Sequence, residues 1–213
     1  DSGAEHLILE DSKLSCRSYT DDFKTTDFSK IEILANLARS IKHDVTLSFN
    51  CDTLIHHRHF ERIKTLIQHL KNADINRIRV QDIGVRLFIE KNYPDVICDL
   101  ATETGNQNLE SIAFHSKFYK SQTLSVEMPY LEIEKCRSLL ENNNDIEFEI
   151  QVQGPILIQY SNRRYMAGFK SQSGLKPVDP DTDPIIKKIA NDEEFPTRLY
   201  PFYDNPHGHF MYL

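Results

Sequence analysis

RIRVQDIGVRLFIEKNYPDVICDLAT, residues 77–102, contains the pattern that decides the fold. RIRVQD (77–82) and DVICDLAT (95–102) alternate or concentrate apolar residues as strands do, and IGVRLFIEKNY (83–93) spaces them by three and four as a helix does. A strand, a helix and a second strand in such a short span predict a βαβ unit. Its two strands run parallel because the helix carries the chain back across the sheet.

The same alternation continues on both sides of this unit. Further strands are expected at HLILE (6–10), VTLSFN (45–50), QTLSVEM (122–128) and IEFEIQVQGPILIQY (146–160). Helices are expected at 28–41, 60–72, 109–119 and 130–142. A β/α barrel and an open doubly wound sheet both fit this order. No GxGxxG or GxxxxGK[ST] phosphate loop follows a strand, so the barrel is the better prediction.

Two helices show apolar faces that should pack on the sheet. The first face consists of Ile31, Leu34, Leu37, Ala38 and Ile41. The second consists of Phe60, Ile63, Ile67 and Leu70. From residue 161 the periodicity fades and prolines accumulate. We therefore expect a barrel-like body over residues 1–160 and an irregular, proline-rich arm with short strands over 161–213, packed on the same domain.

Composition narrows the class of protein. Lys and Arg number 25 and Asp and Glu 32, giving 25 − 32 = −7, and the mean hydropathy is −0.49. No apolar run approaches the ~18–20 residues of a membrane span, and no signal peptide is visible. The four cysteines lie far apart in sequence. These features predict a globular cytoplasmic protein with reduced thiols and no membrane association. The negative charge argues against a general nucleic-acid coat, though a local basic patch stays possible.

Polar residues gather where the predicted strands end, which is where parallel β/α proteins bind ligands. They are Asn50, Cys51, Asp52, Gln81, Asp82, Thr102, Glu103, Glu127 and Gln153. Each residue taken alone is more simply explained as a cap of the following helix. The set as a whole favours a shared pocket.

Two charged clusters have simpler explanations than a ligand site. His56-His57-Arg58-His59 could offer imidazoles to zinc, but no HExxH is present and adjacent histidines cannot all point one way. A solvated helix start is the preferred interpretation, so no metal is predicted. Four cations, Lys117, Lys120, Arg163 and Arg164, could form an anion site or be scattered surface charge.

Five segments together resemble the collagenase-like peptidase family U32. LSCRSY (14–19) is similar to its F-S-x-R-x-Y signature and RIRVQDIGVRLFIEKNYPDV (77–96) to its V-Q-D-x-G segment. TLSVEMPYLEI (123–133) resembles its strand-plus-glutamate segment, and QGPILIQYSNRRYM (153–166) resembles H-G-A-L-C-x-x-Y-S-G-R-C. RLYPFYDNPHGHFMY (198–212) resembles the ending of a short subgroup. The resemblance spans nearly the whole chain in order and spacing.

The resemblance implies a TIM-barrel-like fold that lacks its first β/α unit, because the family's G-A segment stands here at residues 3–9. Another segment or a partner should then cover the exposed sheet edge. Iron–sulfur members have cysteines where this chain has Leu157 and Arg164, and a histidine where it has Gln153. Iron–sulfur clusters need about four thiolates, so neither a cluster nor another cofactor is expected. The chain looks like the short type found beside a longer cluster-bearing paralogue.

The resemblance also implies a function. Similar family members act in 5-hydroxyuridine formation at the tRNA wobble position, so we expect an RNA-modification factor that works with a cluster-bearing partner on tRNA or a small anionic co-substrate. Asp82 and Glu127 are the expected catalytic residues. Substrate binding is expected from Ser15, Arg17, Gln81, Gln153, Tyr160 and Arg163. Within this set, Arg17 and Arg163 would hold an anion.

Two alternatives stay open. A peptidase would need Asp82 or Glu127 to activate water, for example on a metal held by residues 56–59. No nucleophile–base pair can be named from the sequence to support it. A non-catalytic scaffold subunit would instead complete the fold of a partner.

Overall fold

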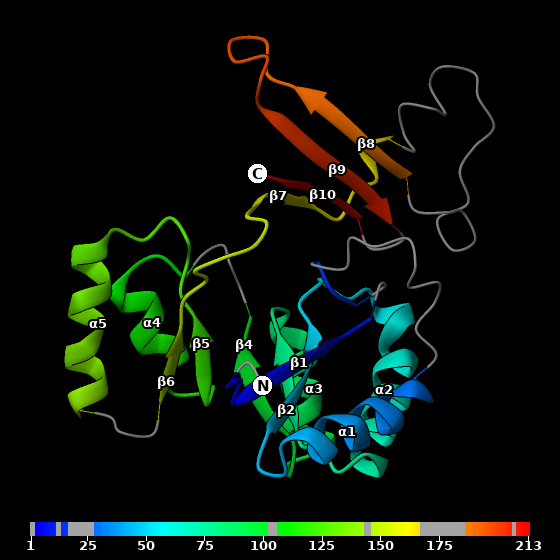
Figure 1. Ribbon diagram of the computed structural model, residues 1–213. Coiled ribbons are helices and arrows are strands. Elements are labelled where there is room, and N and C mark those ends of the chain that lie inside the picture. Colours follow the sequence, from blue (N-terminus) through cyan, green and yellow to red (C-terminus); the bar gives the residue numbers. More distant parts are fainter. Residues whose placement is uncertain are drawn as a thin grey trace.

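A six-stranded parallel sheet forms the body of the molecule (Figure 1). The computed structural model describes residues 3–11, 14–16, 28–101, 106–142, 146–166, 186–205 and 208–213. The sheet strands are β1 (His6–Glu10), β2 (Thr46–Cys51), β3 (Arg77–Val80), β4 (Ile97–Leu100), β5 (Ser121–Thr123) and β6 (Glu147–Glu149). Each strand pairs in parallel with the next along the chain. This order confirms the repeated β/α architecture, closed here only as far as a half-barrel.

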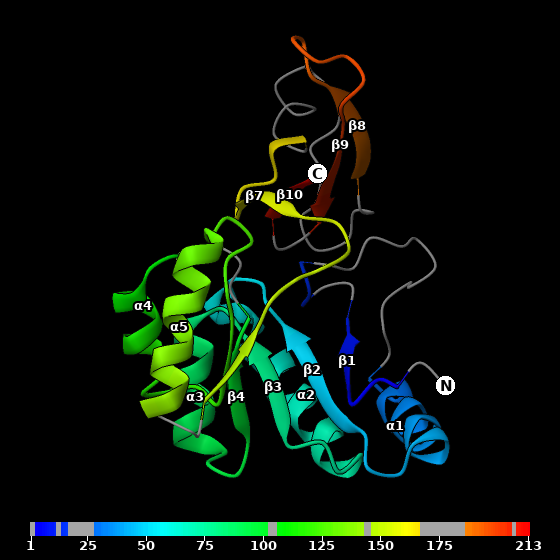
Figure 2. The same ribbon diagram turned by 60° about the vertical axis from the view of Figure 1, so that its left-hand side comes forward.

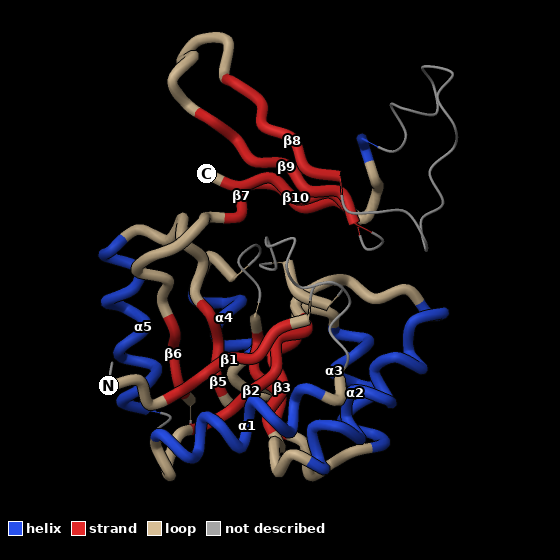
Figure 3. The backbone as a smooth tube through the Cα atoms, turned by 45° about the vertical axis from the view of Figure 1, so that its right-hand side comes forward, coloured by secondary structure: helices blue, strands red, loops and turns tan. Residues whose placement is uncertain are grey.

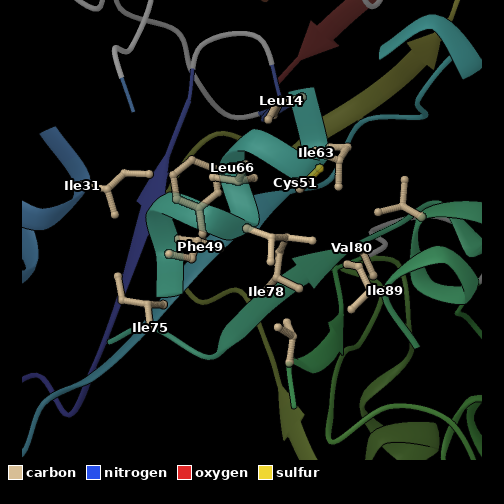
Figure 4. Close-up of a cluster of buried hydrophobic side chains, with 14 of the residues drawn as sticks. Leu14, Ile31, Phe49, Cys51, Ile63, Leu66, Ile75, Ile78, Val80 and Ile89 are labelled. Carbon is tan, nitrogen blue, oxygen red and sulfur yellow. The ribbon is translucent and has the colours of Figure 1, made fainter. Parts of the chain in front are cut away.

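The helices cover one face of this sheet, and the core lies between the two layers (Figures 2 and 4). They are α1 (Lys30–Ile41), α2 (Phe60–Asn72), α3 (Ile83–Asn92), α4 (Leu109–His115) and α5 (Tyr130–Asn142), with a 3-10 turn η1 (His57–His59) before α2. Phe49 and Cys51 on β2, and Ile78 and Val80 on β3, point into this core. In the described ranges, no helix combines the length and apolar character needed to cross a membrane.

The predicted face of the second helix is confirmed and that of the first is largely wrong. On α2, Ile63, Leu66, Ile67 and Leu70 are buried. On α1 only Ile31 and Ala35 are buried, while Leu34, Leu37 and Ile41 are 41%, 56% and 74% exposed. The reason is the neighbouring strand: β1 lies at the end of the sheet, and no described strand pairs with its free side. The rest of the apolar stripe on α1 therefore has no described strand to pack on.

A second sheet is built from the last quarter of the chain (Figure 3). It comprises β7 (Leu157–Ser161), β8 (Ile186–Asn191), β9 (Leu199–Asn205) and β10 (Gly208–Tyr212), in the antiparallel order β7-β10-β9-β8. The predicted run 146–160 thus splits into β6 and β7, which belong to different sheets. The described part of the arm is more regular than its prolines suggested. The predicted domain boundary at residue 160 falls inside β7 and stays a prediction.

One glycine allows the neighbouring strands β7 and β10 to approach closely. Gly208 begins β10 with φ +141°, in the region that other residues rarely adopt. A Cβ at this position would lie 2.0 Å from the carbonyl oxygen of Ser161 at the end of β7. A side chain is therefore sterically excluded where β10 starts.

The second sheet lies over the carboxyl ends of the parallel strands (Figure 1). The Tyr160 hydroxyl accepts a 2.9 Å hydrogen bond from the backbone N–H of Leu54, just after β2. The Tyr160 ring stacks on Phe210, with centroids 4.9 Å apart. Cys16 packs against Leu157, Phe210 and Tyr212. The antiparallel sheet thus roofs the edge where a ligand site was expected.

Candidate functional site

The face of the parallel sheet that carries no helices is polar and charged. Strand register places Glu10, Asn50, Arg79 and Asp99 in one row across β1 to β4. Arg79, 5% exposed, bonds Glu149 on β6 and donates to the Thr123 hydroxyl on β5 at 2.9 Å. These contacts tie distant strands together, since each partner comes from a different strand.

A second ionic group lies one pleat closer to the amino ends of the strands. Arg77 contacts Asp99 on β4 and Glu147 on β6. Burial by itself raises the pKa of Glu149, but the charge and hydrogen bond of Arg79 outweigh it and hold that pKa below its usual value. Both arginines are therefore satisfied by carboxylates. A ligand would bind above them, at the carboxyl ends of the strands, rather than displace them.

Asn50 is the centre of the site at that edge. Its Nδ2 lies 3.1 Å from Glu10 Oε1, 3.1 Å from Ser15 Oγ and 3.0 Å from Asp52 Oδ2. A primary amide has two N–H groups, so it cannot satisfy three acceptors at once. Its Oδ1 is buried and has no hydrogen-bond partner in the described part of the chain. The buried Oδ1 of Asn50 is therefore an acceptor that this cluster can offer to an N–H or O–H group of a ligand.

The loop after β2, residues 52–56, gathers contacts from three of the segments that carried the family resemblance. The N–H of Cys16 donates to Asp52 Oδ1 at 2.6 Å. Tyr160 accepts from Leu54, and Asp82 Oδ2 accepts from the N–H of Ile55 at 2.9 Å. Of the predicted site residues, Ser15, Asp82 and Tyr160 thus converge on one region. Burial raises the pKa of the Tyr160 phenol, so it stays a neutral donor and acceptor.

Asp82 itself acts on the backbone. It is the N-cap of α3, and its Oδ1 accepts from the N–H groups of Gly84 at 2.7 Å and Val85 at 3.3 Å. A Cβ on Gly84 would lie only 3.0 Å from that oxygen. This geometry explains the V-Q-D-x-G pattern physically: the aspartate caps the helix and the glycine leaves room for it. The catalytic role predicted for Asp82 stays a prediction.

The remaining predicted residues are less closely grouped. Glu127 is exposed and accepts from Gln107 Nε2 at 2.8 Å. Gln153 and Arg163 are exposed, and Gln81 is half-buried between β3 and α3. Arg17, Thr102 and Glu103 lie outside the described residues. Within the described ranges, no hydrogen bond links Glu127, Gln153 or Arg163 to the Asn50 cluster.

The sequence reasoning missed Glu10 as a site residue and did not single out Asn50. The signal for both was their position at a strand end. The four cations do not form one site, because Lys120 precedes β5 at the amino edge of the sheet and Arg163 follows β7 above the carboxyl edge.

The described residues do not fit a metal or an iron–sulfur cluster. No three His, Cys, Asp or Glu side chains in the described ranges are placed to hold a metal ion. The four cysteines are free: Cys51 and Cys98 pack in the main core, whereas Cys16 and Cys136 each belong to a separate cluster. Burial raises the pKa of the Cys51 and Cys98 thiols, that of Cys98 to about 12. Cluster ligands must be thiolates, so these thiols are poor candidates.

The protein is therefore a β/α protein of the barrel type. Its parallel sheet forms a half-barrel with a polar inner face, and the second sheet covers the carboxyl edge. The chain belongs to peptidase family U32, whose family model matches residues 1–175. The solved structure of the U32 peptidase Mk0906 is similar in fold, with a TM-score of 0.52 and 11% identity. That match covers 85% of this chain and 74% of the other.

Two curated relatives are tRNA hydroxylation proteins P. The one from Haemophilus influenzae is 24% identical over 116 residues, and the one from Escherichia coli K12 is 25% identical over 115 residues. Each match covers 52% of this chain and 24% or 25% of the relative. The matched part therefore spans about a quarter of the length of these relatives.

Proposed function

We propose that this chain acts in tRNA hydroxylation, as a factor for 5-hydroxyuridine formation at the wobble position. The observation that carries the proposal is the 24–25% identity to two tRNA hydroxylation proteins P over half of the chain. Membership of family U32 agrees with it, because the resemblance to that family already implied a role in 5-hydroxyuridine formation.

The chemistry of the Asn50 cluster supports a nucleoside ligand. A uracil ring carries one N–H donor between two carbonyl acceptors, and the ribose carries hydroxyl groups. Glu10 and Asp52 would accept hydrogen bonds from such donors, and the buried Oδ1 of Asn50 offers a further acceptor. This acidic site recognises the nucleoside and not the phosphate, since like charges repel.

The net charge of −7 favours a partner. Affinity for RNA comes largely from cations that neutralise phosphates, and this chain has an excess of carboxylates. We propose a cluster-bearing paralogue as that partner, which would supply both the positive surface and the redox chemistry. A small anionic co-substrate is a further proposed ligand. This chain would itself hold no cofactor.

Deletion of the gene tests the proposal, in a strain with no redundant paralogue. Nucleosides from total tRNA are quantified by mass spectrometry after complementation with wild type, Glu10→Gln or Glu61→Gln. Glu10 contacts the Asn50 amide, whereas Glu61 lies exposed on α2 and is the matched control. We expect loss of 5-hydroxyuridine derivatives on deletion, rescue by wild type and Glu61→Gln, and weaker rescue by Glu10→Gln at equal protein level. Unchanged nucleosides on deletion would reject the proposal.

A further inference from the structure

We propose that Arg164 is the anchor of a phosphate-binding site just beyond the end of β7 in the second sheet. Arg164 lies three residues beyond the end of β7. Its Nε, Nη1 and Nη2 atoms are all buried, and within the described residues none has a hydrogen-bond partner. It is the one guanidinium among those residues with all three nitrogens in this state.

The physical cost of this arrangement points to a missing anion. A guanidinium has five N–H donors and cannot lose its proton in a protein, so it has no neutral form to adopt. A buried charge without a counter-charge is strongly destabilising. A buried lysine could lower its pKa and become neutral, but an arginine needs an oxyanion. An anion that binds Arg164 would turn this local instability into affinity.

The neighbouring arginine provides the contrast. Arg163 is exposed, and its backbone N–H donates to the Ser161 hydroxyl at 3.2 Å. The resemblance to family U32 had favoured Arg163 as the anion-binding residue. The role of Arg163 stays a prediction, and an exposed guanidinium is already solvated and gains less from an anion than a buried one does.

A phosphate suits the site best. The planar fork of an arginine binds two oxygens of one phosphate at once. The carboxylates around Asn50 repel phosphate, so a nucleotide bound there needs its phosphates held elsewhere, and the second sheet roofs that edge. The identification of this group as an RNA phosphate rests on the proposed function, whereas the anion site itself does not.

The first test is a thermal melt of the full chain in which inorganic phosphate replaces chloride at constant ionic strength. Wild type, Arg164→Met and Arg163→Met are compared. We expect phosphate at ten times its dissociation constant to raise the melting temperature of wild type and Arg163→Met by about 3–5 °C. Arg164→Met should melt at or above wild type without phosphate and should not respond to it. This sign is diagnostic, since removal of an arginine with a structural partner lowers the melting temperature.

Two results would overturn the site: Arg164→Met melts below Arg163→Met without phosphate, or it responds to phosphate as wild type does. A second measurement separates the source of the phosphate. Inorganic phosphate should compete with a single-stranded RNA for wild type, and Arg164→Met should reduce the salt dependence of RNA binding by about 0.7 in log–log slope. Phosphate binding through Arg164 without RNA binding would keep the anion site and overturn its RNA identity. Normal tRNA hydroxylation together with no phosphate response would overturn the anion site alone.

Discussion

Substitution of Asp82 by alanine separates the capping role seen in the structure from the catalytic role expected from the sequence. The carboxylate accepts from two N–H groups at the start of α3 and from Ile55 in the loop after β2. Loss of an N-cap costs about 1 kcal/mol. Leaving the buried N–H of Ile55 unpaired costs about 1–3 kcal/mol more. Asp82→Ala should therefore lower the free energy of unfolding by about 2–4 kcal/mol.

Urea unfolding followed by circular dichroism measures this change. With a slope of about 2 kcal/mol per molar, the midpoint should fall by about 1–2 M. Asp82→Asn is the control, because asparagine is an equally good N-cap but has one acceptor oxygen where aspartate has two. It should lose no more than about half as much. The reasoning is refuted if the alanine variant unfolds with wild type, or if asparagine is as damaging as alanine. A stable Asp82→Asn protein that fails to restore 5-hydroxyuridine would support the catalytic prediction.

Three further predictions concern the sheet and its roof. Gly208→Ala places a Cβ against the Ser161 carbonyl and should lower the free energy of unfolding by about 3 kcal/mol or more. The same urea assay measures this change, and an unchanged midpoint would contradict the prediction. Tyr160→Phe removes the hydrogen bond to Leu54 and should cost about 1–2 kcal/mol, with no change in the fold by circular dichroism; an unaltered midpoint would show that the bond is not formed. Burial, aided by nearby arginine charge, lowers the pKa of His6. The stability that neutral His6 contributes is therefore present above about pH 6.5 and is lost as the pH falls through the lower pKa of His6 in the folded protein. The urea midpoint of wild type should drop more than that of His6→Gln between neutral and mildly acidic pH. Equal drops would contradict the assignment.

Local periodicity was enough to predict the order of strands and helices. The strand at 77–80 and the helix that follows it are where RIRVQD and its neighbour placed them, because each pattern is set by residues close in sequence. Burial of a helix face depends on its neighbours as well. The stripe on α1 has the same spacing as that on α2, yet Leu37 and Ile41 are exposed because the sheet ends beside them.

The residues of the candidate site were also hard to predict, because their contacts join positions far apart in the sequence. The strand-end rule drew attention to residues 50–52, but the bonds of Asn50 join positions 35 and 40 residues away, which no local pattern encodes. Arg163 and Arg164 are identical in sequence signal. The structure distinguishes them, because Arg163 is exposed whereas the guanidinium nitrogens of Arg164 are buried. Both follow β7, a strand whose partner β10 lies almost fifty residues further along the chain.

The free side of β1 also limits how further strands could be added to the parallel sheet. Leu7 and Ile8 are 38% and 42% exposed on that strand, whose other side pairs in parallel with β2. A short hairpin reverses direction, so it can extend the sheet only antiparallel, whereas a parallel addition needs a crossover of a dozen or more residues. Such crossovers are almost always right-handed. An engineer who wished to enlarge this barrel would therefore graft a whole right-handed repeat, since a single added ribbon would flatten the curve and leave a template for fibre formation.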